Sequence, residues 1–283
     1  MEQEEYSECQ LHNEMETIEI DLLLEGIYRY YGLDFRNYAR PFLKRRIWNR
    51  IRAENVSSIS GLQERVFHDP YAMKKLFCDF SINVTEMFRD PSFFLSFRTQ
   101  IIPLLREHSE VRIWHAGCST GEEVYSMAIL LQEEGLYEKT RIYATDMNNN
   151  VLKYAQRGEF PLHRMQLYTK NYLAAGGTRA FSEYYTAEHE NAKFDPYLAK
   201  NVIFAEHNLA ADRSFNEFHV IICRNVMIYF NKLLQNRVYN LLHQSLSVSG
   251  ILGLGSKEGL KFTSIANFYE EVDPIEKLYR KIK

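Results

Sequence analysis

Two glycines and two glutamates lie close together in the stretch Trp114–Glu123, which reads WHAGCSTGEE. Such a turn between an apolar strand and a helix is where nucleotide-binding folds hold their ligand. Gly117 and Gly121 lack the spacing of a dinucleotide fingerprint or of a phosphate-binding P-loop. Glu122 and Glu123 would repel a phosphate, which needs free N–H groups and positive potential. The stretch therefore predicts a ligand without a phosphate.

A ligand with an adenosine, a sulfonium cation and an amino acid end fits this turn better. The glutamates favour the positive charge, and the glycines admit close approach of the ribose and methionine parts. The alternative is that Glu122 and Glu123 only complement the helix dipole, for about 0.3–1 kcal/mol each. Asp146 ends the next apolar run and is placed to take both ribose hydroxyls, or else to cap the following helix. Together the two signals favour S-adenosylmethionine.

The segments that must position these residues fall into two regimes. Up to residue 108 the apolar pattern is helical, and Ser58 or Ser60 is a candidate N-cap for one of the helices. From residue 111 onward short apolar runs alternate with helical segments, which predicts a parallel sheet with helices on both faces. Residues 168–194 break the alternation with Gly-Gly and Phe/Tyr-rich runs, which suggests a small antiparallel insert.

Charge is distributed unevenly along a chain whose net charge is -3. The first 28 residues contain nine acidic residues and no Lys or Arg, and we interpret this start as a solvated, partly disordered tail. Residues 35–52 contain seven cations and no acid, with apolar residues at helical spacing. This basic helix either presents a solvated face or attracts an acidic partner. A nucleic-acid partner is disfavoured by the overall acidic balance and by the lack of a nucleic-acid-binding motif.

Composition narrows the remaining possibilities. The 283-residue chain has a mean hydropathy of -0.37 and no apolar run near the roughly 20 residues that span a bilayer. The start lacks the features of a secretory signal, and the four cysteines have no paired spacing, so we expect a cytoplasmic protein with reduced thiols. Cys118 is better explained as a small buried thiol than as a nucleophile. The histidines lack the spacing of a metal cluster, so we expect no metal.

Five stretches, taken in order, resemble the motifs of CheR-type chemoreceptor glutamate O-methyltransferases. They are SINVTEMFRDPSFF (81–94), HAGCSTGEEVYSMA (115–128), ATDMN (144–148), FAEHNL (204–209) and ICRNVMIYF (222–230). The resemblance runs from about residue 20 to the end of the chain. It implies a class I methyltransferase fold, which is Rossmann-like: a doubly wound, mostly parallel α/β sheet with a small all-helical N-terminal domain and an inserted antiparallel β-subdomain.

We therefore expect four segments: an acidic tail over 1–17, a helical domain with the basic helix over 18–80, a connector over 81–108, and a methyltransferase domain over 109–283. The insert is expected at about 168–200. The resemblance implies that the connector contributes to the cofactor site.

The resemblance also implies roles for particular residues. Arg89 and Tyr229 would lie nearest the reacting centre. The residues implied to bind S-adenosylmethionine or its product S-adenosylhomocysteine are Asn83, Thr85, Arg89, Gly117, Glu123, Asp146, Asn208, Leu209, Asn225 and Val226. The partner would be the cytoplasmic helical bundle of a chemoreceptor, reached by steering from Arg40, Lys44, Arg45, Arg46 and Arg50. Nothing demands more than a monomer or direct insertion into a membrane.

The expected chemistry needs little acid–base help, because a glutamate side chain is already ionised at neutral pH. Positioning of that carboxylate behind the methyl carbon is the main task left to the protein. Arg89 can orient a carboxylate through two hydrogen bonds, or else pair with neighbouring Asp90. Two alternatives remain: the same methylation on another signalling protein, and a catalytically silent module that binds the cofactor or a receptor.

Three features depart from the family pattern. Met87 replaces a frequent aromatic residue, which is a tolerable apolar exchange. The segment GLGSKEGL stands where many relatives have histidine-serine-glutamate, so we expect a reshaped substrate entrance. The insert is short around Gly176-Gly177, so docking of a receptor C-terminal peptide on its edge is not assumed.

Overall fold

The computed structural model describes the backbone of residues 2–81 and 83–283, and the side chains of residues 13–81 and 83–283. The chain divides into two compact units: Met1–Ile82 with Tyr229–Gln235, and Asn83–Ile228 with Asn236–Lys283. Within the described residues, no helix has the length and apolar character needed to cross a bilayer.

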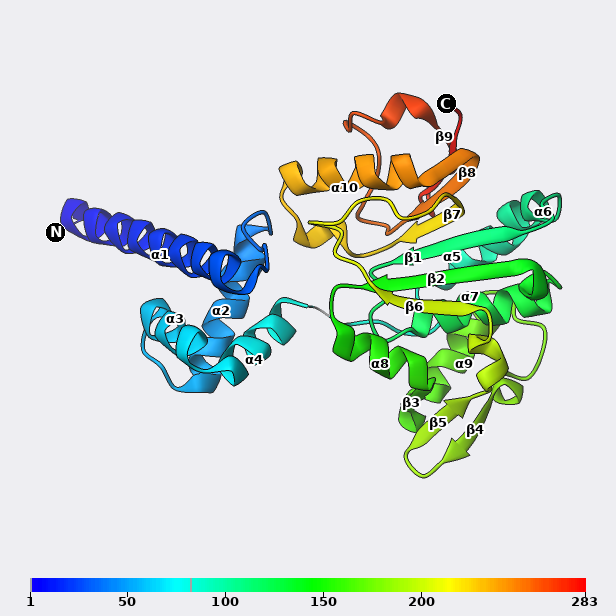
Figure 1. Ribbon diagram of the computed structural model, residues 1–283, viewed down its shortest axis with the longest axis horizontal. Helices are drawn as coiled ribbons and strands as arrows, with labels where there is room; N and C mark the ends of the chain where they lie inside the picture. The colour runs from blue at the N-terminus through cyan, green and yellow to red at the C-terminus, as the bar shows by residue number, and fades with distance from the viewer. Residues whose placement is uncertain (1, 82) are drawn as a thin grey trace. The chain divides into compact units, whose positions relative to one another are not determined.

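Helices form the first unit (Figure 1): α1 (Glu2–Tyr31), α2 (Arg40–Glu54), α3 (Ile59–His68) and α4 (Pro70–Phe80). Their apolar stripes bury Leu23 and Ile27 of α1 together with Leu43 and Ile47 of α2. Ser58 caps α3, because its side chain accepts a hydrogen bond from the Gly61 N–H at 3.0 Å. The predicted all-helical N-terminal domain is confirmed, and so is one of the two candidate caps.

The prediction of a partly disordered acidic tail is wrong for the backbone from Glu2 onward, since α1 begins there. Glutamate is a good helix former, and acidic residues near a helix N-terminus are favoured by the helix dipole. Glu16 is buried and accepts hydrogen bonds from Lys44 and Trp48 of α2 at 2.5 and 2.6 Å. The end of the predicted tail is thus part of the helical packing, and the side chains of residues 1–12 lie outside the described residues.

The second unit contains a seven-stranded sheet in the order β6-β2-β1-β7-β8-β10-β9 (Figure 1). The strands are β1 (Val111–Ala116), β2 (Thr140–Asp146), β6 (Val202–Glu206), β7 (Phe218–Cys223), β8 (Leu246–Leu254), β9 (Tyr269–Asp273) and β10 (Leu278–Lys281). The helices are α5 (Pro91–Ser96), α6 (Ile102–Leu105), α7 (Glu122–Glu133), α8 (Asn149–Arg157), α9 (Met165–Ala174) and α10 (Lys232–Ser245), whose first residues belong to the first unit. A π-helical turn, Phe97–Ile101, joins α5 to α6.

The pairing within this sheet is parallel from β6 to β8, and β10 and β9 are antiparallel additions. Alternate residues of the strands face opposite layers. Ile113 belongs to the main apolar core, which includes side chains of α5, α7 and α9. Trp114 faces the other way, where its ring packs against Phe215 and Phe218 at centroid distances of 5.2 Å. The predicted mostly parallel, Rossmann-like sheet is confirmed.

A separate three-stranded antiparallel sheet forms the insert, in the order β3 (Glu159–Pro161), β5 (Asn191–Phe194), β4 (Tyr185–Glu188). The antiparallel insert is confirmed, but it begins at β3, and residues 165–174, which the aromatic pattern partly assigned to the insert, form helix α9. Tyr168 and Tyr172 on α9 are both fully buried. Their spacing of four residues is that of a buried helix stripe, which explains the difference.

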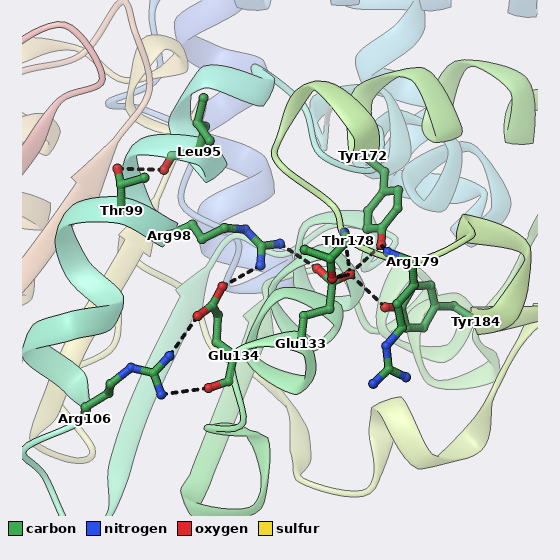
Figure 2. A network of polar contacts seen from close by, with 10 residues as sticks. All are labelled: Leu95, Arg98, Thr99, Arg106, Glu133, Glu134, Tyr172, Thr178, Arg179 and Tyr184. Atoms are coloured by element: carbon green, nitrogen blue, oxygen red, sulfur yellow. Dashed lines mark hydrogen bonds and ion pairs between the residues drawn. The ribbon is translucent and has the colours of Figure 1, made fainter.

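A buried carboxylate, Glu133 at the end of α7, fastens the base of the insert (Figure 2). It pairs with Arg98 of the π-helical turn at 2.6 Å and accepts hydrogen bonds from the hydroxyls of Tyr172 at 2.5 Å and Tyr184 at 3.1 Å. The Thr178 N–H and hydroxyl each donate to it at 2.9 Å. Burial raises the pKa of Glu133, but these bonds outweigh it and lower the pKa below the usual value. One ionised side chain therefore joins three segments of the second unit.

Candidate functional site

The turn after β1 is tied to the neighbouring strand tips. The N–H groups of Gly117 and Cys118 donate to the carbonyl of Thr145 in β2 at 2.8 and 2.9 Å. Gly117 has φ +82, and a Cβ there would lie 2.6 Å from a methyl group of Val226, beyond β7. Only glycine combines a positive φ with the lack of a Cβ that would clash with Val226. The turn therefore lies close to both β2 and the loop after β7, at the carboxyl ends of the strands. This is the edge at which open α/β sheets bind ligands.

Asp146 ends β2 at that edge, and both of its oxygens are engaged by backbone. The Ser119 N–H donates to one at 2.9 Å and the Asn148 N–H to the other at 3.0 Å. Burial raises the pKa of Asp146, and the backbone N–H groups offset part of that rise. Asn148 is the N-cap of α8, because its side chain accepts from the Asn150 N–H at 3.0 Å. The alternative in which Asp146 caps this helix is therefore wrong.

The connector reaches the same edge through Asn83. The Ser119 hydroxyl, in the turn, donates to the Asn83 side-chain oxygen at 3.3 Å. Ser119, Asn83 and Asp146 therefore lie together, as the resemblance implied for the last two. Thr85 also lies in the connector, and its backbone carbonyl accepts a hydrogen bond from the guanidinium of Arg164 at 3.2 Å.

The two glutamates of the turn have different environments. Glu122 is buried, which raises its pKa, and it accepts a hydrogen bond from the Thr120 hydroxyl at 2.6 Å. Glu123 lies 3.0 Å from Nδ1 of His115 and 3.0 Å from Arg224. Burial raises the pKa of Glu123, but His115 and Arg224 outweigh it and lower the pKa. Both carboxylates thus serve the packing of the turn, and the role of Glu123 in holding the cofactor stays a prediction.

Arg224, which the sequence did not single out, is the centre of a buried ion-pair cluster. Its side chain is 2% exposed and pairs with Asp90 at 2.6 Å as well as with Glu123. It also donates to the carbonyl of Arg89 at 3.3 Å, and its guanidinium lies 4.0 Å from the centroid of the Phe93 ring. The sequence did contain one signal for this role: Arg224 directly follows the apolar strand FHVIIC, where a charged residue needs a partner if it is buried.

Arg89 lies between two residues held in the left-handed region, Phe88 with φ 51 and Asp90 with φ 54. The Phe88 N–H donates to the Ser126 hydroxyl at 2.8 Å, which fixes this conformation on α7. The Arg89 guanidinium donates to the Val84 carbonyl at 3.0 Å, and Asp90 pairs with Arg224 instead. The alternative of an Arg89–Asp90 salt bridge is wrong. Strained backbone around a half-buried arginine is typical of a functional connector.

Two further loops border this edge of the sheet. β6 pairs in parallel with β2, Asp146 opposite Glu206, so Asn208 and Leu209 follow at the same edge. The Asn208 side chain accepts from the Ala210 N–H at 2.9 Å, and Leu209 is buried. Beyond β7, Asn225 adopts φ 60.

Glu258, a second residue that the sequence reading missed, fixes the loop after β7. Its buried carboxylate accepts four backbone N–H groups at 2.7–3.0 Å, from Asn225, Val226, Met227 and Gly255. It lies within the GSKEG segment that departs from the family pattern.

The remaining predicted site residues belong to the first unit. Three of the five cations predicted to bind substrate form ion pairs: Arg40 with Asp21, Lys44 with Glu16, and Arg50 with Asp79. Acidic residues of α1 and α4 therefore neutralise part of the positive charge of the basic segment, which its own sequence does not indicate. Tyr229 packs its ring 5.1 Å from that of Phe42. The roles of Tyr229 and of these cations stay predictions.

Cys118 lies buried in the turn after β1. Burial raises the pKa of the Cys118 thiol well above its usual value, in keeping with a packing role. Among the residues that the structure describes, no group of three or more His, Cys, Asp and Glu side chains could hold a metal ion.

The donor set at the strand tips fits S-adenosylmethionine. Asp146 keeps acceptor capacity for hydroxyl groups beyond its hydrogen bonds to backbone N–H groups. Gly117 lets the turn pack closely against the loop after β7, and the turn 117–123 contains no Lys or Arg that would favour a phosphate.

Comparison with known proteins covers both units. Residues 18–81 match the family described as "CheR methyltransferase, all-alpha domain", and residues 83–273 match "CheR methyltransferase, SAM binding domain". The chain is 50% identical over 264 residues to the candidate methyltransferase Cher3 of Pseudomonas putida, covering 93% of this chain and 97% of that protein. It is 29% identical over 234 residues to the chemotaxis protein methyltransferase of Listeria monocytogenes, with coverage of 82% and 86%. The identity is also 29%, over 249 residues, to chemotaxis protein methyltransferase 2 of Pseudomonas aeruginosa, with coverage of 85% and 86%.

Proposed function

Because the chain belongs to the CheR methyltransferase family and contains its S-adenosylmethionine-binding domain, we propose that it methylates glutamate side chains on the cytoplasmic helical bundle of a chemoreceptor. The product on the receptor is a glutamate methyl ester. Each ester removes one negative charge and thereby biases receptor signalling. The protein would act in the cytoplasm as a monomer.

The observation that carries the proposal is the cluster Asn83–Ser119–Asp146 beside the strained connector that presents Arg89. Asp146 would hold the ribose, Asn208 and Leu209 would border the adenine, and Asn225 and Val226 would flank the methionine part. When bound, the cofactor supplies an electrophilic methyl group on a sulfonium, and S-adenosylhomocysteine remains.

The work of the protein residues is orientation, because a glutamate carboxylate needs no base at neutral pH. Arg89 would orient the substrate carboxylate, and its anchoring at Val84 and through Arg224 limits how far it moves. Tyr229 would lie beside the reacting centre, and the free cations of α2, such as Arg45, would steer the acidic receptor surface.

The test combines cofactor binding with turnover. Calorimetric titration should show micromolar binding of S-adenosylmethionine and S-adenosylhomocysteine, no binding of NADH, and loss of binding in Asp146→Ala. Asp195→Ala is the matched control, since Asp195 only accepts a backbone hydrogen bond from Tyr197 in the insert. Wild-type protein should then form base-labile methyl esters on a purified receptor fragment.

The outcomes separate the alternatives. Cofactor binding without ester on the receptor fragment, but with ester on another signalling protein, would replace the substrate. Binding without any turnover would indicate a silent module, and no binding would refute the methyltransferase function.

A further inference from the structure

The loop that follows β8 begins directly beside the loop that follows β7. The two strands are parallel, with Cys223 opposite Leu254, so both loops start at the ligand-binding edge of the sheet. Glu258 then ties them together, because its carboxylate accepts N–H groups from both: Gly255 in its own loop and Asn225, Val226 and Met227 in the other. The loop after β8 is therefore built into the site.

The stem of this loop is anchored on both sides of its tip. Leu260 and Ile265 are buried, and the Tyr239 hydroxyl donates to the Gly259 carbonyl at 3.0 Å. A turn closes above them, since the Thr263 N–H and hydroxyl both donate to the Leu260 carbonyl, at 3.0 and 2.6 Å. Lys261 and Phe262 occupy the tip of that turn.

Phe262 is the most exposed apolar side chain of the described residues, at 94%. It also has φ 67, a conformation that a bulky side chain adopts only at a steric cost. The Leu260–Thr263 bonds hold it there, so a fixed backbone displays an aromatic ring outward on a loop whose base is tied to the site. Strain and exposure of this kind are retained where the side chain meets a partner.

The charges of the loop define that partner. Lys257 and Lys261 are exposed, and Glu258, the one carboxylate in 255–268, is buried and fully engaged. The ammonium of Lys261 lies 5.4 Å from the centroid of the Phe262 ring. An aromatic ring with one cation beside it, in a loop that exposes a second lysine, complements a surface that combines carboxylates with apolar side chains.

We propose that the segment Lys257–Phe262, which ends in this tip, docks an acidic, amphipathic helix of the methyl-accepting protein. Phe262 would contact the apolar residues of that helix, and Lys257 and Lys261 its carboxylates. The inference rests on the proposed function and adds a substrate-binding element to it. The occupant is the substrate helix, because the tip is joined through Glu258 to the loop that carries Asn225 and Val226.

Phe262→Ala tests the proposal in full-length protein with the purified cytoplasmic fragment of a methyl-accepting chemotaxis protein. We expect the KM for the fragment to rise about tenfold, with kcat at saturation and the Kd for S-adenosylmethionine unchanged. Lys261→Gln should flatten the salt dependence of kcat/KM. The matched control is Val248→Ala, an apolar side chain 66% exposed near the opposite end of β8, which should leave the KM unchanged.

Two failures are distinguishable. If wild-type protein methylates the fragment and Phe262→Ala has the wild-type KM, the docking tip is refuted and the proposed function stands. If wild-type protein binds the cofactor but never esterifies the fragment, the proposed function fails and the docking proposal fails with it.

Discussion

Replacing Arg224 by methionine removes the one cation from the buried cluster that joins α7, the connector and the end of β7. The variant keeps an apolar stem over Phe93 but leaves Glu123, 18% exposed, with His115 as its remaining partner. Losing one partner of a buried pair typically costs about 3–5 kcal/mol. Asp90 is 44% exposed, so its contribution is screened and adds about 0–1 kcal/mol. We therefore expect the free energy of unfolding of the second unit to fall by about 3–6 kcal/mol at pH 7.

The pH dependence separates the charge effect from packing. Arg224 helps to lower the folded-state pKa of Glu123 below 4.5, so the stability gained from that shift is fully present above pH about 4.5 and is lost as the pH falls through the folded-state pKa. The difference between wild type and Arg224→Met should therefore stay constant from neutral pH to about 4.5 and shrink below that, as the pH falls through the folded-state pKa of Glu123.

Urea unfolding followed by circular dichroism at a series of pH values measures this difference. Arg141→Met is the control, since Arg141 is exposed and bonds only to Asn201 by its side chain, and it should change stability by less than about 0.5 kcal/mol. A loss in Arg224→Met that stays constant as the pH falls well below about 4.5 would show that packing, rather than the ion pair, explains the effect. A loss below about 1 kcal/mol at pH 7 would refute the buried-charge reasoning altogether.

Three further predictions address the site and the insert. Gly117→Ala should weaken S-adenosylmethionine binding at least tenfold by calorimetry, because the new Cβ would lie 2.6 Å from Val226. Gly135→Ala is the control: Gly135 also has a positive φ but has open space around it, so this variant should bind S-adenosylmethionine normally. Glu258→Gln should lower kcat about tenfold or more with little change in the Kd for the cofactor. The reason is that one amide oxygen cannot accept all four N–H groups that bond to the Glu258 carboxylate and hold the loop after β7. An unchanged kcat would show that Glu258 is not a positioning residue. Glu133→Gln should cost about 2–4 kcal/mol in urea unfolding while leaving cofactor binding in place, and a loss near zero would contradict the fastening of the insert.

The sequence predicted what depends on local pattern. Apolar runs alternating with helical segments revealed the parallel strands, and Ser58 was one of two candidate caps before an apolar helix. β9 was not predicted, because its sequence, YEEVD, is polar and contains no apolar run. It is an antiparallel strand at the edge of the sheet, where a strand need not be apolar on both faces.

The contacts that escaped prediction join residues far apart in the chain. Arg224 and Glu123 are 101 positions apart, and Arg224 and Asp90 are 134 apart. Glu258 acts through backbone N–H groups of residues whose identity says nothing about the bond. Likewise, the acids that neutralise the basic helix come from other helices, so a count within 35–52 overstated its field.

The way in which Glu133 secures the insert has a consequence for how this protein can diverge. The fastening lies at the base, on α7, Arg98 and the tyrosines, whereas the β4–β5 turn, at the other end of β4 from Tyr184, is exposed. Mutations that lengthen, shorten or recharge that turn leave both the anchor and the strand tips intact. Sequence changes in the β4–β5 turn can therefore accumulate without loosening the attachment of the insert.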